Sequence, residues 1–81
     1  MARDEKIKLL ATKIKSVLQD NSIYVERIVD IQLVTCYIGM ESAIVIVEAG
    51  PQGSEVIKHK PLTKKQYDEI LEYTEELNKY L

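Results

Sequence analysis

The residues of this chain best suited to bind an anion lie between positions 58 and 65. The segment "KHKPLTKK" holds four lysines and the single histidine of the sequence: Lys58, His59, Lys60, Lys64 and Lys65. The last two lysines coincide with a predicted helix start, where unpaired backbone N–H groups add partial positive charge. These side chains are therefore candidates for contact with a phosphate or a nucleic acid. The alternative interpretation is a solvated edge strand, because lysines there prevent two sheets from pairing edge to edge.

Catalytic chemistry has weaker candidates. Cys36, the single cysteine, would need a neighbouring base or cation to act as a nucleophile, and His59 lies on a different predicted strand. We therefore expect Cys36 to be a small buried core residue. The acidic residues of the last helix are expected on its solvated face: Asp68, Glu69, Glu72, Glu75 and Glu76. No Cys/His cluster has zinc-ligand spacing. We expect no catalytic residue, no metal site and no cofactor, so the protein is predicted not to be an enzyme.

Two helices are predicted to flank the candidate segment and the strands before it. Apolar residues recur at helical spacing near the N-terminus, at Ile7, Leu10, Ala11, Ile14, Val17 and Leu18. The second helix begins after Thr63, where Thr63 and Gln66 form a capping-box pattern. Its predicted apolar stripe consists of Tyr67, Ile70, Leu71, Thr74, Leu77 and Leu81.

Three strands are predicted between these helices. Residues 22–38 are rich in Ile, Val, Tyr and Thr, which favours a strand with a bulge near "ERIVD", although two shorter strands remain the alternative. A three-residue loop at 39–41 would join this strand to the next one, pairing Val34 with Ile46 and Cys36 with Ile44. The segment "AGPQGS" predicts a turn. A short strand at 55–60 is expected to end at Pro61.

The elements predict an α+β fold with the order α-β-β-β-α and a single domain over residues 1–81. In it, a small antiparallel sheet with a long central hairpin packs against the N- and C-terminal helices. Both faces of the hairpin are apolar, whereas a sheet with one wet face would alternate with polar residues. Either one helix covers each face, or both helices share one face and a second copy covers the other. We favour the second arrangement and assign the milder face to the dimer: Leu33, Thr35, Tyr37, Ala43, Val45 and Val47.

Size and composition support a partner. An 81-residue chain buries only about 60–65% of the surface of its unfolded form, and one cysteine allows no internal disulfide. Oligomerisation is the remaining source of stability. The charged N-terminal segment holds no apolar core of a signal peptide, and residues 31–40 are too few for a membrane span. We therefore expect a cytoplasmic protein without a membrane partner.

The α-β-β-β-α order is similar to that of double-stranded-RNA-binding domains, which present lysines at the start of their second helix as Lys64 and Lys65 stand here. The acidic second helix and the two-sided apolar sheet depart from that family's pattern. The formal net charge of −2 also argues against a protein that coats nucleic acid. The leading hypothesis is thus a non-enzymatic homodimeric interaction or regulatory module. The alternative is a nucleic-acid-binding module that uses residues 58–65 and the first-helix lysines Lys6, Lys8, Lys13 and Lys15.

Overall fold

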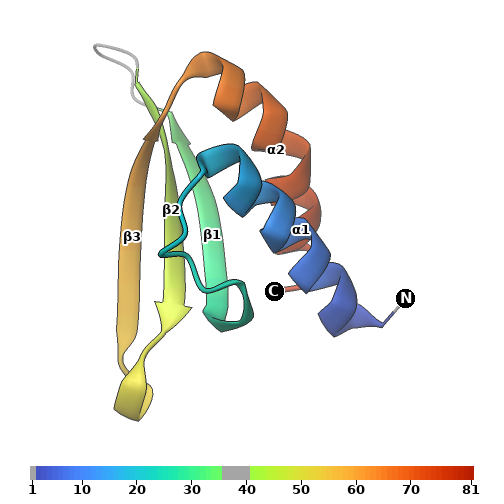
Figure 1. The fold of residues 1–81 in the computed structure, drawn as a ribbon, viewed down its shortest axis with the longest axis vertical. Coiled ribbons are helices and arrows are strands. Elements are labelled where there is room, and N and C mark those ends of the chain that lie inside the picture. The colour runs from blue at the N-terminus through green and yellow to red at the C-terminus, as the bar shows by residue number, and fades with distance from the viewer. Residues whose placement is uncertain (1, 36–40) are drawn as a thin grey trace.

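The computed structural model describes residues 2–35 and 41–81, and it confirms the predicted α+β fold and element order (Figure 1). Along the chain, one α-helix precedes the three strands of the sheet and one follows them. Two short 3₁₀ turns lie in the connections. The elements are α1 (Arg3–Leu18), η1 (Val25–Arg27), β1 (Ile28–Thr35), β2 (Ser42–Ala49), η2 (Pro51–Gly53), β3 (Glu55–Leu62) and α2 (Lys64–Asn78). Within the described residues, neither helix is long and apolar enough to cross a membrane.

Local sequence signals determine where the helices begin and end. The capping box is confirmed, since the Gln66 N–H donates to Thr63 Oγ1 at 3.1 Å and the Thr63 N–H donates to Gln66 Oε1 at 3.0 Å. Helix α1 ends where Gln19 adopts a left-handed conformation with φ of 55° and its N–H bonds to the Lys15 carbonyl. The predicted turn at "GPQGS" is also confirmed, closed by a 2.8 Å bond from the Gly50 N–H to the Ser54 carbonyl.

Both helices lie on one face of the sheet (Figure 1). They run antiparallel to each other. At one end the Gln66 amide donates to the Val17 carbonyl at 3.4 Å, and at the other the Arg3 guanidinium donates to the Tyr80 carbonyl. The core lies between this helix pair and the sheet, and its most deeply buried side chains are Ile14, Ile23, Ile31, Ile44, Ile46, Ile70 and Leu77.

The strands form a meander in the order β1-β2-β3, and the predicted antiparallel hairpin of β1 and β2 is confirmed. Its predicted register is wrong. Val34 pairs with Ala43 rather than Ile46, and Ile44 pairs with Leu33. The loop predicted at 39–41 lies mostly outside the described residues, the last described pair before it being Thr35 with Ser42. The prediction that Cys36 is buried and pairs with Ile44 concerns a residue outside the described ones.

The prediction of one bent strand from residue 22 is wrong in its first part. Strand β1 begins at Ile28, because residues 20–27 turn through an Asp20–Ser22 hydrogen bond and the 3₁₀ turn η1. The Ser22 N–H donates to Asp20 Oδ1 at 2.9 Å, a side-chain bond that competes with strand pairing. The expected irregularity is present further on, where the register with β2 shifts between Ile28 and Asp30.

Strand β3 continues past its predicted end. Pro61 pairs with Ala43 and Leu62 pairs with Ser42, so Pro61 lies inside the strand. The sheet order explains why this is tolerated: β3 is an edge strand, where a residue without an N–H can direct its nitrogen away from the ladder.

Candidate functional site

The sheet face that points away from the helices has no intramolecular cover among the described residues (Figure 1). We call it the open face. Alternation along each strand and the pairing between strands define its rows. The rows are Asp30–Val47–Ile57, Gln32–Val45–His59 and Val34–Ala43–Pro61, with Ala49 and Glu55 at the end of β2 and β3.

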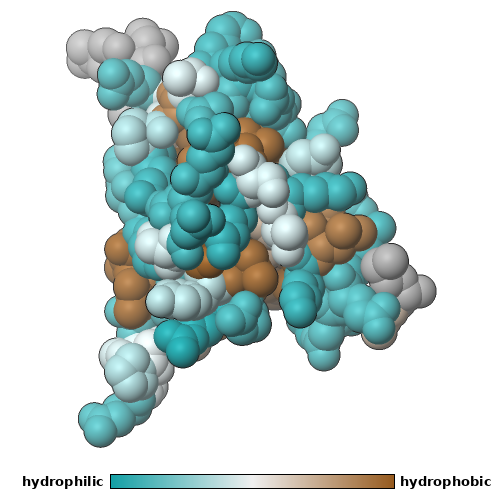
Figure 2. All heavy atoms as spheres, in the orientation of Figure 1, coloured by the Kyte–Doolittle hydropathy of each residue, from teal (hydrophilic) through white to brown (hydrophobic). Residues whose placement is uncertain are grey.

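Apolar side chains on the open face remain in contact with water. Ile57 on β3 is 66% exposed, the highest value among the large apolar residues that the structure leaves at its surface. Val47 beside it and Val45 in the next row are half-buried, as is Val34 on β1 at the other side of this face. Figure 2 shows one apolar patch at the left edge of the molecule, over part of β3 on the side away from the helices. A contiguous apolar surface of this kind is typical of an interaction site.

The predicted dimer face divides between the two sides of the sheet. Ala43, Val45 and Val47 lie on the open face as expected. Leu33 and Thr35 do not, because Leu33 pairs with the buried Ile44 and contacts the core under the helices. Grouping them with Val45 was wrong, since a register change by an odd number of residues exchanges the faces of one strand relative to the other. Tyr37 lies outside the described residues.

Two open-face residues were missed by the sequence reasoning. Ile57 and Val34 belong to this face. The sequence held a signal for Ile57, because Ile57, His59 and Pro61 are two residues apart and therefore share one side of β3. The adjacent Ile57 and Lys58 must point to opposite sides of β3, which indicated an apolar side chain on one side of the strand and a charged side chain on the other. The predicted basic segment is split by this same alternation.

Lys58 points to the helix side and is occupied by an internal network. Its Nζ lies 3.1 Å from Oε1 of Glu48, which is only 2% exposed, and it also donates to the Ser22 carbonyl. The second carboxylate oxygen of Glu48 accepts the Tyr24 N–H at 3.0 Å. Lys58 and Arg27 both lie over the Tyr24 ring, at 5.2 and 4.8 Å from its centroid. Glu48 is a structural residue that the sequence did not reveal.

Lys60 is held in the same way, by an ion pair with Asp20. Hydrogen bonds from Lys60 and then from Ser22 lower the pKa of the Asp20 carboxyl far below its ordinary value. The Lys60–Asp20 pair attaches residue 20 to the helix side of β3, and the Lys58–Glu48 pair holds residues 22–24 through hydrogen bonds to the Ser22 carbonyl and from the Tyr24 N–H. We call the pairs Lys58–Glu48 and Lys60–Asp20 the latch.

The remaining members of the basic segment lie apart from the latch. His59 is on the open face, and Lys64 and Lys65 are in the first turn of α2. Lys64 pairs with Asp68 at 3.0 Å while its side chain stays 89% exposed. The structure thus brings Lys64 and Lys65 together and distributes the other three over two faces of β3.

The four lysines of α1 have different neighbours, and two of them contact α2. Lys6 lies 3.4 Å from Glu76, and Lys13 lies 5.3 Å from the centre of the Tyr73 ring, so both contact α2. Lys8 and Lys15 are on other parts of α1. Because the acidic helix packs beside α1, part of the positive charge is neutralised within the molecule.

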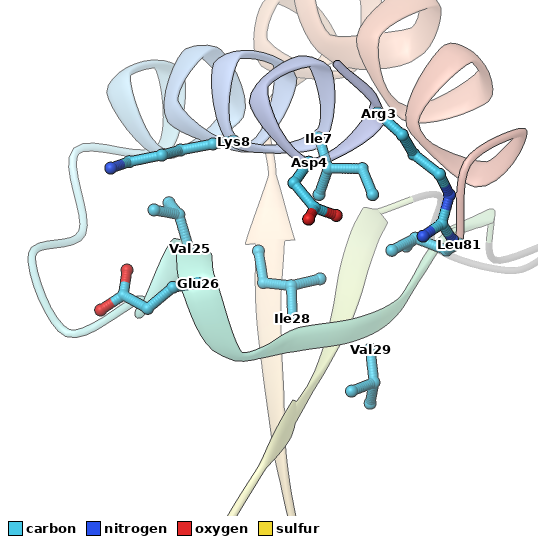
Figure 3. Close-up of a pocket in the computed structure, with 9 residues that line it drawn as sticks. All are labelled: Arg3, Asp4, Ile7, Lys8, Val25, Glu26, Ile28, Val29 and Leu81. Atoms are coloured by element: carbon cyan, nitrogen blue, oxygen red, sulfur yellow. The ribbon is translucent and has the colours of Figure 1, made fainter.

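A cavity of about 480 Å³ lies between the start of α1, η1 and β1 (Figure 3). Its lining combines apolar residues with two cations and two anions: Arg3, Asp4, Ile7, Lys8, Val25, Glu26, Ile28, Val29 and Leu81. Arg3 is already engaged with the Tyr80 carbonyl. The balanced charges select neither an anionic nor a cationic ligand.

Within residues 2–35 and 41–81, no three His, Cys, Asp or Glu side chains are grouped so that they could hold a metal ion. Comparison of the chain with protein-family models, curated proteins and solved structures finds no match. The functional argument therefore depends on the geometry of the chain itself.

Proposed function

We propose that this protein is a non-enzymatic interaction module that forms a homodimer through the open face of its sheet. The observation that carries the proposal is the exposed Ile57 beside Val45 and Val47 on a face that neither α1 nor α2 covers. Burying an exposed Ile side chain stabilises an association by about 2 kcal/mol, and a symmetric dimer gains this twice.

The dimensions of the open face suit a modest interface. Three strands of eight residues, spaced about 4.8 Å apart with about 3.3 Å per residue, give a footprint of roughly 400 Å². Two such faces have a combined footprint of roughly 800 Å², which is below the standard size of specific interfaces and corresponds to a weak or transient one. We therefore expect a weak dimer whose population depends on protein concentration.

The nucleic-acid alternative has less support. It requires the lysines of residues 58–65 to act together, but Lys58 and Lys60 already have carboxylate partners on the helix side. Moving either lysine to a phosphate would leave Glu48 or Asp20 unpaired. This cost favours self-association over phosphate binding.

Sedimentation velocity over a range of concentrations tests the proposal. Ile57→Asp should shift the protein to the monomer, because an unpaired carboxylate cannot be buried in a closed interface. The monomer should stay folded, since Ile57 is largely exposed within one copy. Val45→Asp should act in the same direction at the centre of the face.

The matched control is Leu9→Asp, which places the same charge at an exposed apolar position of α1. It should leave the association unchanged. A wild-type protein that stays monomeric at high micromolar concentration would contradict the proposal, as would an Ile57→Asp variant that dimerises as well as the parent. Salt-sensitive binding of mixed RNA and DNA that is lost in a Lys64→Gln and Lys65→Gln variant would instead favour the alternative.

A further inference from the structure

The two edges of the sheet differ in their protection against an added strand. β3 carries Lys58, Lys60 and Pro61, and lysines and a proline on an edge strand hinder pairing with a further strand. β1 is the other edge, and its residues 28–35 include no lysine, arginine or proline. Its one charged side chain is that of Asp30. The composition of the two edges therefore favours β1 as the one that accepts a strand.

The outer backbone groups of β1 have no hydrogen-bond partner among the described residues. The strand pairs with β2 on its inner side, and no other described hydrogen bond involves a backbone group of residues 28–35. In an edge strand, N–H and C=O groups also point away from the ladder. The register shift between Ile28 and Asp30 bends the start of β1, so the outward groups are regularly spaced over residues 31–35. An extended peptide backbone is the ligand that can pair with them.

The cavity of about 480 Å³ adjoins this same edge, because residues of α1, η1 and β1 line it and no residue of β2 or β3 does. Figure 3 shows the Ile28 side chain pointing toward α1 and the Val29 side chain pointing away from it. The side chains of an added strand alternate in the same way. One of them would enter the cavity against Ile7 and Ile28, and the next would cover Val29, which is 49% exposed. Both positions favour an apolar side chain.

The charges around the cavity favour a neutral occupant. Lys8 and Glu26 lie at the end formed by η1, whereas Arg3 and Asp4 lie nearer to Leu81 (Figure 3). Each end thus presents one cation and one anion. An ionic ligand would meet a group of like charge at either end, whereas an uncharged peptide segment buries no charge of its own.

We infer that the edge of β1 and this cavity form a groove that binds an extended, uncharged segment of a partner protein. The segment adds to the sheet as a fourth strand beside β1 and inserts one apolar side chain between α1 and β1. Backbone hydrogen bonds provide the affinity, and the cavity selects the inserted side chain. This groove is at the opposite edge of the sheet from Ile57, so the inference does not rest on the homodimer.

A panel of fluorescein-labelled hexapeptides tests the inference. Each peptide is acetylated and amidated, and each alternates threonine with valine, isoleucine, leucine or phenylalanine. Fluorescence anisotropy should show saturable binding of at least one of them. Two N-methylated versions of that peptide, methylated on the threonines or on the apolar residues, should differ in affinity on the order of tenfold, because only every second N–H of an added strand faces β1.

Val29→Lys is the variant of the groove. Val29 is half-exposed and has no partner in the β1–β2 register, so the variant should fold, as circular dichroism would show. Peptide binding should weaken on the order of tenfold, because a lysine at this edge hinders strand addition. Leu9→Lys is the matched control, since Leu9 is 40% exposed on α1 outside the cavity lining, and it should bind the peptide as the wild type does.

Amide NMR spectra locate the bound peptide, which should shift the signals of residues 28–35 more than those of β3. The inference is overturned if no peptide of the panel binds, if both N-methylated versions bind equally, if Val29→Lys binds as well as the wild type, or if the shifts lie on β3. Ile57→Asp should still bind the peptide, and Val29→Lys should still self-associate in sedimentation velocity. A monomeric wild type that binds the peptide would therefore contradict the homodimer and support the groove.

Discussion

Neighbouring residues of β3 have different surroundings although their side chains are chemically similar. Lys58 and Lys60 form ion pairs with Glu48 and Asp20, while His59 between them faces solvent on the open face. A run of basic residues in a strand is thus divided by the period of two into separate environments. The positive charge in "KHKPLTKK" indicates ligand binding only where the structure leaves it without an internal partner.

The buried hydroxyl of Thr74 offers a direct test of polar burial. Its Oγ1 has no hydrogen-bond partner among the described residues, and Thr74 is only 2% exposed on α2. Thr74→Val should raise the free energy of unfolding by about 1 kcal/mol, because valine keeps the shape without a polar atom to desolvate.

Urea denaturation measures this change, and Thr12→Val is the matched control. The Thr12 hydroxyl is exposed and donates to the Lys8 carbonyl at 2.7 Å, so its removal should be neutral or slightly destabilising. A loss of stability in Thr74→Val would show that its hydroxyl has a partner in solution.

The Glu48–Lys58 pair is expected to stabilise the fold only as a pair. Glu48→Gln should lower the free energy of unfolding by about 2 kcal/mol, because it leaves the Lys58 charge half-buried without its carboxylate. The amide oxygen of the variant could still accept the Tyr24 N–H. The double variant with Lys58→Met should lose less than the sum of the two single changes, as measured in a double-mutant cycle. Additive losses would mean that the two side chains do not interact.

Among the elements, the connection between α1 and β1 departs most from its sequence prediction. Its residues favour a strand by composition, yet Asp20 and Ser22 form a local turn and Glu48 captures the Tyr24 N–H. The partners that hold it lie on β2 and β3, far along the chain. Strand propensity reflects only the local preference of a segment. The contacts that hold this connection to β2 and β3 therefore could not be predicted from it.

The latch gives this connection a pH dependence. The pKa of Asp20 is lower in the folded protein than in the unfolded chain, so its ion pair stabilises the fold fully above the ordinary aspartate pKa of about 3.9. The stabilisation is lost as the pH falls below that value toward the lowered pKa. Asp20→Asn should therefore flatten the acid side of the stability profile, measured by urea denaturation from near pH 7 to near pH 3.

Asp68→Asn provides the control for this experiment. Asp68 also pairs with a lysine, but both side chains are exposed on α2, where water and salt screen the pair so that it contributes little to folding. The variant should keep the wild-type acid profile. An Asp20→Asn profile that coincides with the wild type would show that the latch contributes nothing at low pH.

For the whole molecule, the sequence predicted the element order, the capping box and the turn at Pro51 correctly. These features depend on signals within a few residues. The register of β1 against β2 could not be predicted in the same way, because Val, Ile and Leu occupy both faces and an odd shift still pairs apolar with apolar. The error in the candidate site has the same cause as the error in register. Ala43, Val45 and Val47 were correctly placed on one face, but Leu33 and Thr35 lie on the other face of the sheet.

The antiparallel contact between α1 and α2 also determines how the protein responds to mechanical force. Arg3 meets the Tyr80 carbonyl and Lys6 meets Glu76, so the two ends of the chain lie at the same end of the helix pair. A load applied between the ends would pull the helices apart like a zipper, breaking a few contacts at a time. The β1-β2-β3 ladder would bear load only after α1 and α2 have separated. In an optical trap, extension should therefore begin with release of the helices at low force, and the sheet should rupture in a later step.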